Sequence, residues 1–310
     1  MDTPSIQPGV DGASHEAKTP TASGAATNFL AKKLSAGLSR SNSASSTASQ
    51  RARRQQPPRP GHVIRDGQIG SFNPVEERDV PGAGRGLFAT AAVARHALLF
   101  AEEPLLFAPK GGARIGNHKV RQFLEGLERL TPRRRAAFMA LHAAPAQRAA
   151  VDKAPADAAR MRSWYAQVKH LTGAALDAAV ADAVHALAVY GTNNVATLAD
   201  DDGGDPDGEV TGGAVYPVFS RINHACDANA AFFYLGVRSQ RLGVRALRDL
   251  AAGEQIFVSY IGETAAQDMT LEERRESLSS WGFECHCGAC VKDMAKKAKE
   301  VEKAAEQAGK

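Results

Sequence analysis

Short apolar runs separated by turn residues stand on both sides of the centre of the chain. Residues 78–89 pass through a glycine-rich turn, and residues 97–100 and 104–107 are brief apolar stretches. Residues 242–247 alternate between apolar and polar positions, and residues 255–261 form a further short run. Runs of this length and periodicity are typical of β-strands. We therefore expect β structure before and after the middle of the chain.

The middle of the chain repeats its apolar residues at three- and four-residue intervals, the spacing of one helical face. The faces consist of Val120, Phe123, Leu124, Leu127 and Leu130, and later of Leu176, Val180, Val184 and Leu187. Between them, Thr131-Pro132 has the pattern of an N-cap followed by proline at the first helical position. These signals predict an Ala-rich helical insert over about residues 116–192 that serves as scaffold.

The first 70 residues lack a recurring apolar pattern and are dominated by Ser, Ala, Gly, Pro and basic residues. This composition predicts a disordered N-terminal tail over residues 1–70. Its basic cluster, Arg51–Arg54, is better explained as solvated tail than as a nuclear-import or nucleic-acid patch. A mitochondrial presequence around Phe29–Leu34 is an alternative that the early acidic residues oppose.

Residues 199–213 form an acidic, glycine-rich stretch after the helical insert. A calcium-binding loop requires ligands at alternate positions and a bidentate acid at the twelfth position. Gly203 and Gly204 stand where ligands are needed, so a solvated loop is the favoured interpretation.

The C-terminal part contains a second helix signal. Thr270 and Glu273 have the spacing of a capping box, which predicts a helix to about Ser280. Residues 292–310 are rich in Lys, Ala and Glu and predict a charged helix or tail that faces solvent or a partner.

Composition limits the classes of protein that the chain can belong to. The 310 residues include 44% hydrophobic residues, enough for one domain with a core or for two small ones. We expect no transmembrane segment or secretory signal, because no apolar run of the required length is evident. The net charge of +4 permits an acidic partner without requiring one.

The four cysteines have the spacing of a metal site. Cys285, Cys287 and Cys290 form a C-x-C-x-x-C motif, and Cys226 lies far upstream. Structural zinc sites take four N/S ligands in a closed tetrahedral shell, and thiolates suit zinc. We predict that the four thiolates bind one structural Zn²⁺ and so fix the C-terminal region to the middle of the chain. Few cysteines in a zinc pattern also favour a reducing compartment.

Four sequence elements in a fixed order resemble those of SET-domain protein lysine methyltransferases with a post-SET zinc motif. They are Gly84-Arg85-Gly86-Leu87, the segment 223–229, the segment 253–260, and the segment 281–287. The resemblance covers about residues 76–291. The helical insert resembles the split SET arrangement of the SET-and-MYND group, without the MYND zinc module, for which no cysteines remain.

This resemblance implies a mainly β fold with an α insert (α+β), consisting of short curved sheets, a pseudoknot and a post-SET zinc knot. The implied SET domain covers residues 71–281, with the insert and the acidic loop inside it. The zinc motif covers 282–291, and residues 292–310 follow as the charged helix or tail.

The resemblance also assigns roles to individual residues around S-adenosyl-L-methionine. The implied cofactor-binding residues are Gly84, Arg85, Gly86, Leu87, Asn193, Ser220, Asn223, His224, Tyr260 and Phe283. Tyr260 is the implied catalytic residue, whose hydroxyl orients the lysine amine, and Trp281 and Phe283 are the implied walls of the lysine channel. Glycine suits close approach of backbone to a ligand, and aromatic walls interact with a cationic amine.

Purely structural interpretations remain open for several of these residues. Gly84–Leu87 is also compatible with a simple turn, His224 with a core histidine, and Tyr260 with a packed strand aromatic. Trp281 and Phe283 are also compatible with packing at a helix end.

The chain departs from the family pattern at four positions. Ala225 and Ala228 stand where the family usually has Ser and Pro, Gln255 replaces an acid, and Val195 replaces a Phe in the segment that begins at Asn193. The loss of a proline is expected to soften the 225–228 loop and to affect turnover more than fold.

The sequence therefore predicts a protein lysine N-methyltransferase whose partner is a protein with an exposed lysine, a histone among the candidates. We expect a monomer in the nucleus, the cytoplasm or both, with no membrane association and no direct nucleic-acid binding. The alternatives are a SET-fold binding protein with weak or no catalysis, and a small zinc module for nucleic acid. The zinc module accounts for the cysteines but not for the motifs before them.

Overall fold

The computed structural model describes residues 63–65, 67–68, 74–109, 117–198, 210–235 and 240–308. The predicted basic cluster, the presequence alternative and residues 199–209 of the acidic stretch lie outside these ranges. The prediction of disorder over 1–70 is wrong at Val63–Ile64, which form strand β1 beside strand β4 (Leu98–Glu102). The reason is that Ile64 is almost fully buried and that β1 pairs with the edge of β4, which β10 leaves open on that side.

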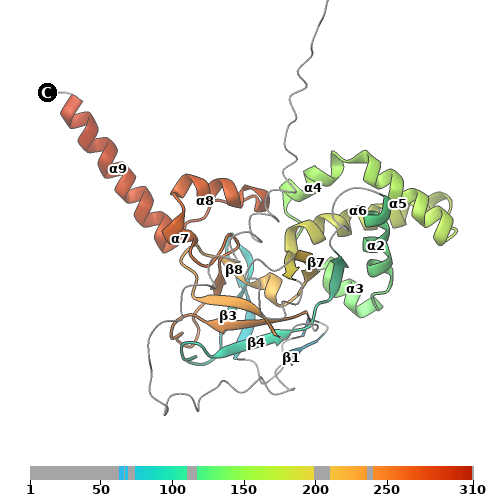
Figure 1. The fold of residues 1–310 in the computed structure, drawn as a ribbon, viewed down its shortest axis with the longest axis horizontal. Helices are drawn as coiled ribbons and strands as arrows, with labels where there is room; N and C mark the ends of the chain where they lie inside the picture. The colour runs from blue at the N-terminus through green and yellow to red at the C-terminus, as the bar shows by residue number, and fades with distance from the viewer. Residues whose placement is uncertain are drawn as a thin grey trace, which may run out of the picture.

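The strands of the described residues form four small sheets. The largest has the order β1-β4-β10-β9, with β9 at Ala230–Leu235 and β10 at Arg241–Ala246. β2 (Val75–Val80) and β3 (Gly84–Ala89) form a hairpin, and β5 (Leu106–Pro109), β7 (Val210–Val215) and β6 (Asn194–Leu198) form a third sheet. The predicted mixture of short sheets with helices is confirmed (Figure 1).

The fourth sheet is a parallel pair only two residues long. It joins β8 (Asn223–His224), which follows the short 3-10 helix η3 (Phe219–Arg221), to β11 (Phe257–Val258). Asn229 reinforces this contact, because its Nδ2 donates to Gln255 O at 2.8 Å and its Oδ1 accepts from Phe257 N at 2.8 Å. The segments before Cys226 and Tyr260 therefore lie side by side.

Five helices occupy the predicted insert and gather on one side of the sheets (Figure 1). They are α2 (Asn117–Glu128), α3 (Pro132–Met139), α4 (Pro145–Asp152), α5 (Pro155–Val168) and α6 (Gly173–Asn193). Thr131 caps α3 as expected, since its side chain accepts from Arg134 N. α4 and α5 were not predicted as separate helices because their Ala-rich sequences lack a strong apolar face, although each begins with a proline.

Helix α6 is long and apolar enough to cross a membrane by length and composition, a test that a core helix of a folded domain also passes. It packs against α3, α4 and α5. Its buried residues are Val180, Ala183, Ala186, Ala188, Val189 and Tyr190. In this structure α6 is therefore the central helix of the insert.

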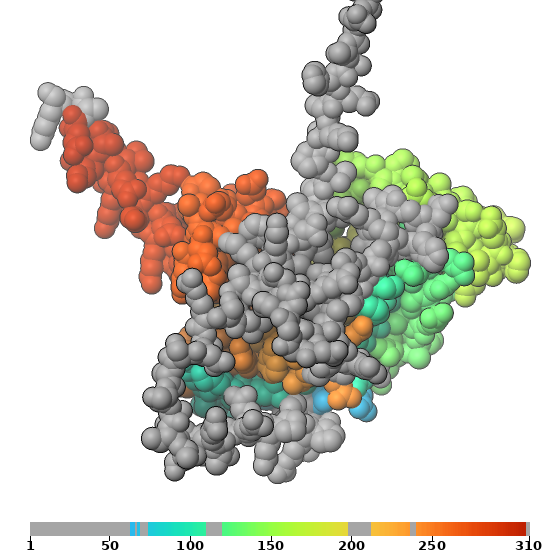
Figure 2. All heavy atoms as spheres, viewed as in Figure 1, coloured from blue at the N-terminus to red at the C-terminus, as the bar shows by residue number. Residues whose placement is uncertain are grey.

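The C-terminal part consists of α7 (Ala265–Asp268), α8 (Leu271–Leu278), η4 (Ser279–Trp281) and α9 (Gly288–Ala308). The capping box of Thr270 and Glu273 is present at the start of α8. α9 begins inside the cysteine motif, earlier than the charged composition alone indicated, and projects from the body (Figures 1 and 2).

A fully buried acid joins the main sheet to the segment that leads into β8. The two carboxylate oxygens of Glu102 each accept a backbone N–H at 2.9 Å, one from Val218 and one from Phe219. Burial raises the pKa of Glu102 to about 8, although both hydrogen bonds oppose the shift.

The raised pKa of Glu102 predicts a loss of stability as the pH rises. The folded chain holds this proton up to about pH 8, whereas the ordinary carboxyl pKa is 4.5. The stabilisation from this group is therefore complete below pH 4.5 and is lost as the pH rises from 4.5 to about 8. We expect the free energy of unfolding to fall with pH less steeply in Glu102→Gln than in the native chain. Urea denaturation between pH 5 and 9 measures both slopes, and equal slopes would contradict the assignment.

Candidate active site and metal centre

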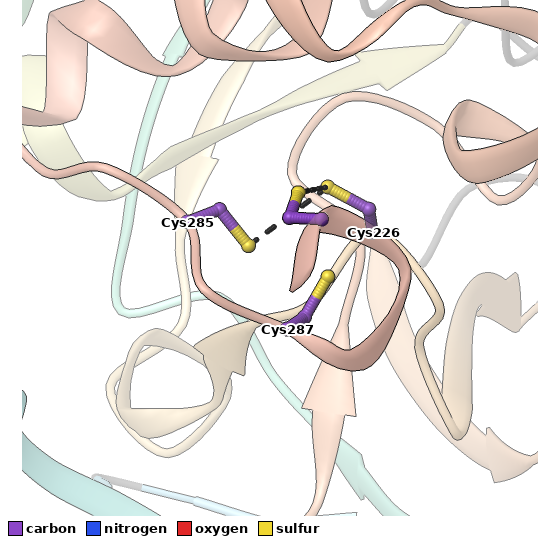
Figure 3. Close-up of side chains that lie close together, drawn as sticks. Cys226, Cys285 and Cys287 are labelled. Atoms are coloured by element: carbon purple, nitrogen blue, oxygen red, sulfur yellow. Dashed lines mark hydrogen bonds between the residues drawn. The ribbon is translucent and has the colours of Figure 1, made fainter. Parts of the chain in front are cut away.

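The structure brings the four cysteines together. Cys226 follows β8, Cys285 and Cys287 lie in the loop after η4, and Cys290 lies in the first turn of α9. Their sulfur atoms all lie within 4.8 Å of one another, and Figure 3 shows the sulfurs of Cys226, Cys285 and Cys287 turned toward a common centre. All four are free thiols, and all but Cys287 are buried. The arrangement matches a closed four-sulfur shell.

The chemistry of these sulfurs fits a cation. The hydrogen bond from Cys226 to the neighbouring Cys285 sulfur, together with burial, raises the pKa of the Cys226 thiol. Four sulfurs at this separation, three of them from buried residues, therefore cannot all ionise unless a positive charge lies between them. A soft dication such as Zn²⁺ satisfies this requirement.

A buried arginine also contacts the sulfur cluster. The side chain of Arg274 in α8 is only 1% exposed, and its Nη1 donates to Met269 O at 2.6 Å. Its Nη2 lies 3.8 Å from Cys290 Sγ and forms an ion pair with Asp293 of α9. The guanidinium places a positive charge beside the thiolates and joins α8 to α9. Sequence reasoning missed this residue, because nothing in its local pattern separates a buried arginine from a solvated one.

The Asn-His segment lies between the sulfur cluster and Tyr260. The β8–β11 ladder pairs Asn223 with Phe257 and His224 with Val258. The ring of His224 is buried, and its Nδ1 accepts the backbone N–H of Tyr260 at 3.0 Å.

Tyr260 is surrounded by three other rings. Its ring centroid lies 5.2 Å from His224, 5.4 Å from Trp281 and 6.3 Å from Phe283. Its hydroxyl donates to Ile222 O at 2.7 Å, and burial raises its pKa above the ordinary value. The phenol is therefore neutral at physiological pH, with its oxygen lone pairs left to accept a further hydrogen bond.

Trp281 and Phe283 form the outer part of this cluster. Trp281 is held by its Nε1, which donates to Thr192 O at 3.2 Å. Phe283 remains 38% exposed, which is unusual for a large apolar side chain of this protein. The two residues that the sequence assigned to a channel wall thus lie beside the predicted catalytic tyrosine.

Gly86 lies against the side chains of two polar residues. A Cβ at this position would lie 2.5 Å from Gln255 Nε2 and 3.1 Å from Asn223 Nδ2. The bridge between Phe88 and Gln255 fixes this contact. Only glycine allows such a close approach. The packing therefore explains why the second position of the predicted motif that carries glycine has no side chain.

Three buried polar atoms in this region have no hydrogen-bond partner: Ser220 Oγ, Asn223 Nδ2 and Gln255 Nε2. Unsatisfied buried groups are rare in native proteins and require an explanation, such as a ligand. Ser220 and Asn223 are among the predicted cofactor-binding residues. The sequence marked Gln255 only as a departure from the family pattern, since its nearness to Gly86 depends on strand pairing.

The remaining predicted cofactor residues contribute differently. Asn193 Nδ2 donates to His142 O and Val189 O, so its amide protons are hydrogen-bonded to backbone carbonyls at the end of α6 and nearby. Arg85 is ion-paired with Glu77 on the neighbouring strand. The side chain of Leu87 lies in the core, so it offers only backbone atoms. Their assignment to the cofactor stays a prediction.

Comparison with known proteins identifies the family. The SET domain family model matches residues 84–261, more than half of the chain. "Histone-lysine N-methyltransferase SET5" of Yarrowia lipolytica is 35% identical over 82 residues, which cover 26% of this chain and 18% of that protein. "Histone-lysine N-methyltransferase SMYD3" of Homo sapiens is 38% identical over 80 residues, which cover 26% of this chain and 17% of that protein. The matched segment thus spans less than a fifth of either relative.

One solved structure that matches part of this chain is described as "Crystal structure of the SET domain of LSMT bound to Lysine and AdoHcy". It matches with a TM-score of 0.38 at 15% identity, covering 63% of this chain and 51% of that one. The family match, over a segment that runs from the Gly84 motif to beyond Tyr260, shows that this chain belongs to the SET domain family.

Proposed function

We propose that this chain is a protein lysine N-methyltransferase that transfers a methyl group from S-adenosyl-L-methionine to a lysine side-chain amine of a protein. The observation that carries the proposal is that three distant segments bring Gly86, the Asn223-His224 pair and Tyr260 to one place beside unsatisfied buried donors. The names of the SET-family relatives support the same activity.

The unsatisfied atoms fit a polar cofactor. Bound S-adenosyl-L-methionine supplies an electrophilic methyl group on a sulfonium. Asn223 Nδ2 and Gln255 Nε2 offer two donors beside Gly86, and Ser220 Oγ offers a further hydroxyl. Each buried donor that gains a partner removes a desolvation cost of about 1–3 kcal/mol. The missing side chain of Gly86 lets both amide groups lie directly against the backbone at this position.

Tyr260 orients the amine in this mechanism. Its hydroxyl proton is directed to Ile222 O, so the oxygen can accept an amine N–H and aim the nitrogen lone pair at the methyl group. The raised pKa excludes the phenol as a base near neutral pH, so the lysine has to react after losing its proton to solvent. Trp281 and Phe283 exclude water from the reacting groups and contact the aliphatic part of the lysine.

We assign the four cysteines to one structural Zn²⁺. The metal would hold the loop 282–287 and the start of α9 against β8, and so fix the aromatic wall beside Tyr260. Zinc neutralises the buried thiolates and supplies folding free energy directly.

The names of the relatives make a histone the first substrate to test. A nuclear or cytoplasmic location is part of the same proposal. A SET-fold binding protein without catalysis is the second candidate, favoured by Ala225, Ala228 and Gln255 in the place of the family's usual residues. Calorimetry with S-adenosyl-L-methionine and a labelled-methyl assay on histones and whole-cell lysate separate the two.

Replacement of Tyr260 by Phe removes only the hydroxyl. We expect the variant to fold and still to bind S-adenosyl-L-methionine, while kcat falls by about 100- to 1,000-fold, the loss typical of one oriented polar group. Single-turnover methylation gives the rate, and calorimetry serves as the binding control. A variant that retains full turnover would remove Tyr260 from the mechanism.

Replacement of Gly86 by Ala inserts a methyl group against the amides of Gln255 and Asn223. We expect about tenfold weaker binding of S-adenosyl-L-methionine, equal to one lost hydrogen bond of about 1.4 kcal/mol. Gly82→Ala is the matched control, because its Cβ meets nothing within 4 Å and its φ of 75° costs stability alone. Equal affinities in the two variants, measured by calorimetry, would rule out this role for Gly86.

Replacement of Cys287 by Ser removes one of the four sulfurs. We expect zinc affinity to fall by at least about 100-fold. Loss of a residue that only supports a metal ligand lowers metal affinity by up to about 100-fold, and loss of a ligand itself should cost at least as much. Competition with a chromophoric chelator measures this affinity. Ala289→Ser is the control, since it adds a hydroxyl next to the site without removing a ligand. Equal zinc affinity in Cys287→Ser and the native chain would exclude the metal assignment.

A further inference from the structure

One side chain links the sulfur cluster to the backbone of the predicted catalytic residue. The buried ring of His224 lies 3.3 Å from Cys226 Sγ through Nε2, and its Nδ1 accepts the Tyr260 N–H at 3.0 Å. The two nitrogens thus contact two parts of the proposed site at once.

The direction of the hydrogen bond at Nδ1 fixes the direction of the hydrogen bond at Nε2. Because Nδ1 accepts a backbone N–H, it carries no proton, and the neutral ring therefore has its proton on Nε2. This proton faces Cys226 Sγ, and a thiolate held by a metal is a good acceptor for it. The tautomer that supports the Tyr260 backbone is therefore the one that the metal-bound sulfur favours.

The position of Tyr260 in the chain explains why it depends on a side chain. The β8–β11 ladder is short, and its next bond, from Ala225 N to Val258 O, is 3.2 Å long. Tyr260 lies two residues beyond Val258, where the ladder has ended. The His224 ring replaces the missing ladder acceptor and also packs 5.2 Å from the Tyr260 ring.

We propose that His224 is a positioning residue that couples occupation of the metal centre to the orientation of Tyr260. The proposal rests on the proposed metal site and methyl transfer, and adds the path between them. The metal fixes Cys226, the sulfur fixes the tautomer and rotation of His224, and Nδ1 fixes the Tyr260 backbone.

The other side chain that approaches the sulfurs does not provide this path. Arg274 contacts Cys290 and joins it to Met269 and Asp293. Among the hydrogen bonds of the described residues, those of His224 reach both a cysteine sulfur and the backbone of Tyr260.

Hydrogen exchange of the Tyr260 amide tests the coupling without any assay of activity. The chain contains five tyrosines, so ¹⁵N-tyrosine labelling of the full chain gives at most five amide signals. Tyr260→Phe identifies the signal of residue 260 by its loss. We expect removal of zinc by a chelator to accelerate exchange of this amide at least tenfold. Tyr165 and Tyr190, inside helices α5 and α6, report any global unfolding.

Two variants separate the contact made by Nε2 from the contact made by Nδ1. His224→Asn retains an acceptor near the position of Nδ1 but cannot reach the sulfur, so we expect a slowly exchanging Tyr260 amide and about tenfold weaker zinc binding. His224→Gln places a donor near Nε2 but removes the acceptor, so we expect native-like zinc affinity and faster Tyr260 exchange. Under saturating zinc and S-adenosyl-L-methionine, kcat should fall more in His224→Gln than in His224→Asn.

A different pattern would overturn the proposal. If both variants change zinc affinity and amide exchange by the same factors, His224 acts only by packing. If the native chain shows the same Tyr260 exchange with and without zinc, relative to Tyr165 and Tyr190, no coupling exists. Zinc-dependent protection of Tyr260 in a chain that transfers no methyl group would refute the proposed function and leave the coupling intact.

Discussion

The closing of four sulfurs around one point is the constraint on which the rest of the site depends. Cys226 and Cys285 are separated by 59 positions, and the chain entropy lost in closing such a loop is about 4 kcal/mol. Packing of the tail also buries thiols that resist joint ionisation. Structural zinc binding supplies about 10–16 kcal/mol, which exceeds the loop-closure cost and removes the electrostatic obstacle. The proposed metal centre would therefore fix the order of the aromatic wall.

Where the strands are too short to hold the site, side chains supply the missing hydrogen bonds. β8 and β11 are each two residues long, and a pair of this length has little stability of its own. Asn229 bonds to the backbone at Gln255 and Phe257, where β11 begins, and His224 bonds to it at Tyr260, after β11 has ended. Glu102 does the same for the segment before β8. Polar side chains buried for this purpose tolerate few substitutions, because each would leave backbone groups unpaired.

The features that sequence predicted are those with local signals. The spacing of the C-terminal cysteines, the Thr131 cap and the Thr270–Glu273 capping box all depend on a few neighbouring residues, and the structure contains each of them. The features that it missed depend on pairing between distant segments. Strand β1 exists because of a free edge on β4, and the place of Gln255 beside Gly86 depends on the Phe88 bridge. No periodicity in one segment contains this information.

The helical insert meets the segment that leads into the cysteine loop at η4, which packs against α4 and contains Trp281. Trp281 lies in η4, directly before the cysteine loop, and its Nε1 donates to Thr192 O in the last turn of α6. The same ring lies 5.4 Å from Tyr260. The wall of the proposed lysine channel is thus fixed from two sides, by the zinc motif and by the end of the insert. A change in the length or packing of α6 would act at once on Trp281 and on Asn193, the last residue of the helix, so the insert is joined both to the proposed channel wall and to one of the predicted cofactor residues.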